Sequence, residues 1–229
     1  VRPLAHEKTR QPEVEIDAEF LNGAETGDLV ELETRRPTRY GPARGKVLAV
    51  IGSLTSEKAV SMIALHAHDI PYIFPAEVLA EADAAEPAGM AGREDWRDAA
   101  LVTIDPADAK DHDDAVSGHA DDDPANPGGV IATVAIADVA AYVRTGSALD
   151  REAQKRGNSV YFPDRVVPML PEGISNDLCS LREGQDRPAL AVRMVFAADG
   201  RKLRHSFHRV MMRSAARLAY PQAQAAIDG

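Results

Sequence analysis

The stretch that most constrains this chain is residues 101–116, in which five aspartates fall within ten positions between two apolar segments. They are Asp105, Asp108, Asp111, Asp113 and Asp114. Carboxylates brought close together raise one another's pKa, so a fold that gathers them must protonate, solvate or neutralise them. Several hard oxygen donors suit Mg²⁺ or Mn²⁺ better than zinc. The stretch therefore predicts a carboxylate site that binds Mg²⁺, or alternatively Mn²⁺, and handles phosphate. Two such ions can stabilise the attacking and leaving oxygens of a phosphoryl displacement.

An EF-hand and an aspartyl phosphatase site both fit the aspartates poorly. An EF-hand loop starting at Asp111 would need glycine at its sixth position and glutamate at its twelfth, where Val116 and Asp122 stand. A phosphatase with an aspartyl nucleophile would place an apolar strand directly before it, whereas Lys110 precedes Asp111. Composition alone leaves open an acidic loop with no ligand.

The chain's size and composition favour a globular protein of one large or two smaller domains. It has 229 residues, of which 45% are hydrophobic, so it can bury a substantial core. Cys179 is the single cysteine, which excludes an internal disulfide and a cysteine-based zinc site. No apolar run approaches the roughly 18 residues of a membrane helix. We expect a monomeric cytoplasmic protein with no membrane association.

The net charge of −10 is concentrated in one region. Residues 76–123 hold 15 acidic and 3 basic residues, and the other positions hold 21 acidic and 23 basic. Two basic stretches, 34–46 and 201–217, lie outside the acidic region. Either one can follow a phosphate backbone or can be a solvated face.

The first 75 residues are predicted to form a small β-barrel. Apolar and acidic residues alternate over 14–20, which is typical of a half-buried strand. Further strands are expected at 29–32, 45–51 and 60–65. A barrel of the oligonucleotide-binding, cold-shock type fits this length. Arg39 and Tyr40 of the basic segment would then lie in its nucleic-acid-binding loop.

A helical linker is expected over 76–98, with a helix at 76–85 and Trp96 as an anchor. The region from 99 to 229 is expected to begin with the aspartate stretch. An apolar run at 130–137 predicts a buried strand that ends at Asp138. Ser147 is expected to cap a helix that runs through Arg156, with Gly157 as its stop. A hairpin of 189–197 and 203–212 and a helix over 215–227 are also expected.

Three longer motifs occur in the order that one protein family shows. They are HDIPYIFPAEVLAEA at 68–82, TIDPADAKDHDDAV at 103–116 and RGNSVYFPDRVVPMLPEGISNDLCSL at 156–181. The chain resembles the ribonuclease II/ribonuclease R (RNB-domain) family of 3′→5′ exoribonucleases, and more closely its ribonuclease R branch. The resemblance implies an α+β fold, with an N-terminal cold-shock/OB-like β-barrel before the first part of a mixed α+β catalytic domain.

The resemblance also implies roles for single residues. The family's metal-site aspartates fall on Asp105, Asp111, Asp113 and Asp114, with Asp113 most directly tied to the chemical step. Tyr161 matches a tyrosine that stacks near the terminal nucleotide. His112 stands where the family often has an apolar residue. The family's catalytic arginine and S1-type domain would follow the last residue here, so we expect a partial chain.

The implied activity is processive 3′→5′ hydrolysis of single-stranded RNA to 5′-mononucleotides with Mg²⁺. The rival hypothesis is a non-catalytic RNA-binding protein with a vestigial metal site. Both would bind the phosphate backbone, so the salt dependence of binding would not separate them.

Overall fold

The computed structural model describes residues 1–2, 13–35, 42–53, 56 and 59–229. The chain divides into two compact units. The first unit contains residues 1–73 and 158–167, and the second contains 74–157 and 168–229. The predicted linker region, 76–98, belongs to the second unit, while the functional domain limits drawn from the sequence remain a prediction.

The first unit contains a three-stranded sheet among its described residues, in the order β1-β3-β2. Its strands are β1 (Val14–Ile16), β2 (Asp28–Arg35) and β3 (Ala43–Ser53). β2 and β3 are antiparallel, whereas β1 runs parallel to β3. The strand expected over 14–20 ends early, because Ala18–Phe20 forms a 3₁₀ turn. The strands expected at 29–32 and 45–51 lie within β2 and β3, but the described part of the unit forms no closed barrel.

The prediction of a strand at 60–65 is wrong. The segment is helix α1 (Ala59–Ala67), with Ser61 and Leu65 buried one turn apart. A short apolar run fits either a strand or a buried helix, so its periodicity does not decide between them. The hairpin of β8 (Val160–Tyr161) and β9 (Val166–Val167) belongs to the same unit and contacts this helix, because Asp164 accepts a hydrogen bond from Ser61.

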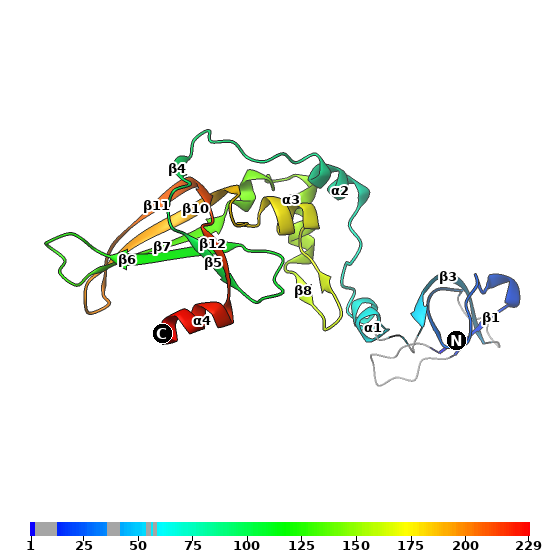
Figure 1. Ribbon diagram of the computed structural model, residues 1–229. Coiled ribbons are helices and arrows are strands. Elements are labelled where there is room, and N and C mark those ends of the chain that lie inside the picture. The colour runs from blue at the N-terminus through cyan, green and yellow to red at the C-terminus, as the bar shows by residue number, and fades with distance from the viewer. Residues whose placement is uncertain (3–12, 36–41, 54–55, 57–58) are drawn as a thin grey trace. The chain divides into compact units, whose positions relative to one another are not determined.

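The second unit is built on a seven-stranded sheet in the order β12-β5-β6-β7-β10-β11-β4 (Figure 1). Its strands are β4 (Glu94–Trp96), β5 (Val102–Asp105), β6 (Asp114–Ala120), β7 (Val130–Ala137), β10 (Asp186–Phe196), β11 (Lys202–Arg213) and β12 (Ala216–Ala219). The five strands from β5 to β11 are antiparallel to their neighbours, and β12 and β4 join the two edges in parallel. The predicted hairpin of 189–197 and 203–212 is confirmed.

Most helical segments of the second unit gather toward one end of this sheet, and the last helix of the chain lies apart from them (Figure 1). They are α2 (Ala76–Asp83), the 3₁₀ turn η2 (Val139–Ala141), α3 (Ala148–Arg156) and the π-helical turn η3 (Gly173–Leu178), with α4 (Tyr220–Asp228) following β12. Val78, Leu149 and Ile174 on these helices join one core with alanines of β7 and β10. Small alanine side chains let helices approach the sheet closely.

The start and stop signals of α3 are confirmed. Ser147 accepts a hydrogen bond from the amide of Asp150, and Gly157 ends the helix with a φ of 78°. Only glycine takes such a φ without a steric cost, so this position suits a helix stop. The helix predicted at 76–85 is also confirmed, as α2.

Two other predictions need correction. β7 is not buried on both faces, because Val130 and Ile136 are 45% and 46% exposed while alternate residues are buried. Residues 216–219 are not helical but form β12, which pairs with β5 and continues its sheet. A helix of 18 or more residues apolar enough to cross a membrane does not occur in the described part of the chain.

Candidate metal centre

Adjacent strand ends bring three of the predicted aspartates together. Asp105 is the last residue of β5, and Asp114 is the first residue of β6, its antiparallel neighbour. One carboxylate oxygen from each of Asp105, Asp113 and Asp114 lies within 4.8 Å of the others. Asp111 does not belong to this group, and Asp108 lies exposed in the connecting loop.

The electrostatics of this group are those of uncompensated like charges. Burial raises the pKa of the Asp114 carboxyl, and the negative charges of Asp113 and Asp105 raise it further. Asp105 is only 7% exposed. A bound cation would reverse these effects, because positive charge favours the ionised form of each carboxylate.

His112 contacts this group directly, which sequence reasoning missed. The residue is 4% exposed, and its Nδ1 lies 2.7 Å from Oδ2 of Asp105. The sequence placed His112 between ligands and gave it no role. The signal in the sequence was that a polar histidine stands where the family often has an apolar residue.

The backbone of the aspartate stretch is fixed in place by hydrogen bonds to two other segments. The amide of His112 donates to Oγ of Ser180 at 3.1 Å, and the amide of Leu181 donates to the carbonyl of His112 at 2.7 Å. On the other side, the amide of Ala137 donates to the carbonyl of Asp113 at 2.9 Å. Hydrogen bonds among three separate sequence segments therefore fix the backbone that carries the aspartates.

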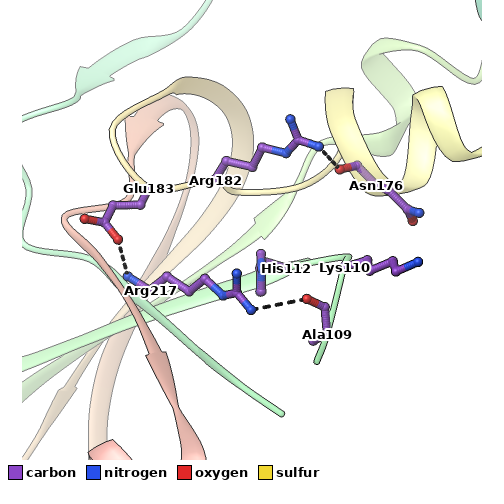
Figure 2. Close-up of a pocket in the computed structure, with 7 residues that line it drawn as sticks. All are labelled: Ala109, Lys110, His112, Asn176, Arg182, Glu183 and Arg217. Carbon is purple, nitrogen blue, oxygen red and sulfur yellow. Dashed lines mark hydrogen bonds between the residues drawn. The ribbon is translucent and has the colours of Figure 1, made fainter. Parts of the chain in front are cut away.

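A pocket of about 660 Å³ opens beside the loop that follows Asp105 (Figure 2). Its lining residues are Ala109, Lys110, His112, Asn176, Arg182, Glu183 and Arg217. Lys110, Arg182 and Arg217 give it a basic lining. Lys110 and His112 belong to the aspartate stretch itself, so this basic pocket adjoins that stretch.

The arginines of this pocket also hold its walls together (Figure 2). Arg217 donates through Nη2 to the carbonyl of Ala107 at 2.9 Å, which fixes the loop between β5 and β6. Arg182 donates to the carbonyl of Asn176 at 2.7 Å. Arg217 belongs to the predicted basic stretch 201–217, so that stretch is in part structural.

Asp138, at the end of β7, is neutralised by arginines. Its Oδ2 accepts hydrogen bonds from Arg93 at 2.7 Å and from Arg209 at 3.1 Å. The side chains of Arg93 and Asp138 are 4% and 2% exposed. A buried carboxylate with two guanidinium partners has no need of a metal ion, so Asp138 is structural.

The predicted RNA-contacting residues fall elsewhere. Tyr161 lies on β8 of the first compact unit and is 67% exposed. Its stacking on a nucleotide stays a prediction. Arg39 and Tyr40 lie outside the described residues.

The three gathered carboxylates fit a hard divalent cation. They offer oxygen donors only, one of them buried, and carry more negative charge than their surroundings balance. These are the properties of an Mg²⁺ or Mn²⁺ site, whereas zinc in proteins is bound mostly by histidine and cysteine.

Two family models match the chain. The RNB domain model covers residues 93–229, and a cold shock domain model covers residues 4–75. Among curated proteins, ribonuclease R of Escherichia coli is 42% identical over 93% of this chain, which spans 26% of that protein. Ribonuclease R of Acidithiobacillus ferrooxidans is 43% identical over 89% of this chain, which spans 46% of that protein.

Solved structures show the same fold. Ribonuclease R of Mycoplasma genitalium in complex with double-stranded RNA matches with a TM-score of 0.83 and 28% identity, over 94% of this chain and 38% of that one. The yeast pseudonuclease Ssd1 matches in fold with a TM-score of 0.66 at 16% identity, over 96% of this chain and 29% of that one. The RNB model alone covers more than half of the sequence, and the motifs at 103–116 and 156–181 lie within the region that it matches. The chain belongs to the RNB domain family.

Proposed function

We propose that this chain is part of a 3′→5′ exoribonuclease that hydrolyses single-stranded RNA processively to 5′-mononucleotides. The observation that carries the proposal is the group of Asp105, Asp113 and Asp114, whose carboxylates lie within 4.8 Å of one another in the RNB region. The curated relatives named ribonuclease R support the activity, and RNA-bound ribonuclease R from Mycoplasma genitalium supports RNA as the partner. A cytoplasmic monomer is part of the proposal.

The proposed metal ligands are Asp105, Asp111, Asp113 and Asp114, with Mg²⁺ as the ion and Mn²⁺ as the alternative. Asp111 enters from the family resemblance, since it stands outside the gathered three. When bound, the metal would supply Lewis-acid stabilisation of phosphate oxygens. Asp105 and Asp114 are proposed to hold it from the two strand ends, and Asp113 is proposed to act closest to the reacting phosphate.

The basic pocket and Tyr161 have different places in this proposal. Lys110 has no hydrogen-bond or ion-pair partner among the described residues and lines the pocket beside the aspartate stretch, so it is free to meet a phosphate. Tyr161 is proposed to stack on a base, a contact worth about 1–3 kcal/mol per base and tolerant of sequence. Arg39 and Tyr40 are proposed to bind RNA from the cold-shock segment.

The test compares two Asp-to-Asn variants in the protein produced from its complete reading frame. Asp113→Asn keeps the size of the side chain and removes its charge. Asp108→Asn makes the same change at an exposed carboxylate of the same stretch. With 3′-labelled RNA and Mg²⁺, Asp113→Asn is expected to lower the rate of hydrolysis more than about 100-fold. The loss of a metal ligand should cost more activity than the loss of a residue that only hydrogen-bonds to a ligand. Asp108→Asn should hydrolyse like the unchanged protein.

The second candidate function is RNA binding without catalysis, with the aspartates as a vestigial site. The fold shared with the pseudonuclease Ssd1 is compatible with it. It would be favoured if the protein bound RNA tightly but showed no metal-dependent turnover. Equal hydrolysis by the Asp113→Asn variant would instead reject the catalytic role of the aspartates.

A further inference from the structure

His112 is held rigidly next to the aspartate group. Its backbone amide and carbonyl bond to Ser180 and Leu181, and the residue is 4% exposed. The imidazole Nδ1 lies 2.7 Å from Oδ2 of Asp105. Backbone and ring are therefore both fixed, and the ring meets one particular carboxylate.

The direction of this hydrogen bond follows from the chemistry of its partners. An ionised carboxylate can only accept, so Nδ1 of His112 carries the hydrogen and donates it to Asp105. The bond uses one of about four lone-pair directions of the carboxylate. The other directions stay available to a cation.

Asp105 needs such a partner more than Asp113 does. The terminal torsion of an aspartate side chain has a broad energy well, so the carboxylate plane turns easily when nothing holds it. Asp113 is exposed and can be solvated, whereas Asp105 is 7% exposed. Among the hydrogen bonds of the described side chains, that from His112 is the one that reaches the Asp105 carboxylate.

We infer that His112 is a positioning residue, which orients the Asp105 carboxylate so that it can bind the divalent cation. The inference rests on the proposed function, because it assumes that Asp105 is a metal ligand. It adds a residue outside the four aspartates to the machinery of the site. Hydrogen-bond partners of metal ligands typically account for about 10–100-fold in metal affinity.

The competing role for His112 is that it only fills space between β5 and the segment at 180–181. Two substitutions separate the two roles. His112→Phe replaces the ring by one of similar size that cannot donate. His112→Asn is smaller, but its Nδ2 can donate from nearly the position of the histidine Nδ1. Both variants keep the backbone bonds to Ser180 and Leu181.

The measurement is the dissociation constant of Mn²⁺ by titration calorimetry without RNA, beside the melting temperature, in the protein from the complete reading frame. We expect His112→Phe to weaken Mn²⁺ binding by about 10–100-fold, and His112→Asn to stay within about threefold of the unchanged protein. The melting temperature should fall more in His112→Asn than in His112→Phe, because the smaller asparagine leaves a cavity. His112→Leu is a second apolar replacement, so the test does not depend on one variant folding.

Controls keep the inference and the proposed function apart. His119→Phe makes the same change at an exposed histidine of β6 and should leave Mn²⁺ binding unchanged. Asp105→Asn gives the affinity of a site without this ligand. If His112→Phe binds Mn²⁺ as tightly as the unchanged protein, the positioning role is wrong. If Mn²⁺ binds equally well to Asp105→Asn and hydrolysis survives Asp113→Asn, the proposed function itself fails.

Discussion

The amide of Leu181 donates a 2.7 Å hydrogen bond to the carbonyl of His112, and this bond joins the two longest motifs of the RNB region. Next to it, the amide of His112 donates to Ser180 Oγ at 3.1 Å. Segments 68 residues apart in sequence thus share one backbone junction next to the aspartates. The second motif therefore supports the metal centre without supplying one of the gathered carboxylates.

The first prediction concerns Ser180, which is fully buried. Ser180→Ala removes the acceptor for the His112 amide and leaves that buried amide unpaired. We expect the free energy of unfolding to fall by about 1–3 kcal/mol. Urea denaturation measures it, with Ser206→Ala at an exposed position of β11 as the control. A loss at Ser206 equal to that at Ser180 would contradict the prediction.

The second prediction compares the two guanidinium partners of Asp138. The Arg93 side chain is 4% exposed and that of Arg209 is 53% exposed, although both bond the same carboxylate oxygen. Arg93→Met should cost about 3–5 kcal/mol of unfolding free energy, because removing one member of a buried ion pair leaves a poorly compensated charge. Arg209→Met should cost clearly less, since solvent replaces an exposed partner. We expect a lower urea midpoint for Arg93→Met than for Arg209→Met. Similar midpoints would show that the burial of Arg93 does not affect stability.

The third prediction concerns the thiol of Cys179, whose pKa burial raises from 9.0 to about 12, with the charge of Asp138 adding to the rise. At pH 8 the fraction of Cys179 ionised to thiolate should be about 1,000-fold smaller in the folded protein than in the unfolded chain. A disulfide reagent should therefore label Cys179 only in denaturant. Because the folded pKa is the higher one, the thiol's contribution to stability is complete below pH 9 and is lost as the pH rises toward 12. Cys179 is the single cysteine among these 229 residues, and mass analysis of the peptide that contains it assigns the label. Equal labelling rates with and without denaturant would refute this.

The fourth prediction concerns the turn before β7. A Cβ at Gly129 would overlap the Asn126 side chain, whose Nδ2 donates to Asp121 at 2.9 Å and to the carbonyl of Phe196 at 3.0 Å. Gly129→Ala should therefore break both bonds and lower the unfolding free energy by about 1–3 kcal/mol. Thermal unfolding measures it. Gly118→Ala is the matched control, because its nearest neighbour would be a carbonyl oxygen 4.0 Å away.

Local sequence patterns predicted the elements that local physics controls. The cap at Ser147, the glycine stop at Gly157 and the turn between β10 and β11 all depend on residues within a few positions. The segment at 60–65 was predicted wrongly because its apolar run has no period that distinguishes a strand from a helix. Residues 216–219 were predicted wrongly because their strand exists through pairing with β5, which is remote in sequence.

Motif order and residue type were enough to identify the family, and they predicted the chemistry of the candidate site and its aspartates. Which of these aspartates lie close together followed from the folded structure. It gathers Asp105, Asp113 and Asp114, leaves Asp111 outside their group, and neutralises Asp138 with two arginines. It also brought the His112 ring to Asp105. Such contacts depend on strand register and on segments folded from afar, and no local pattern of residues contains those distances.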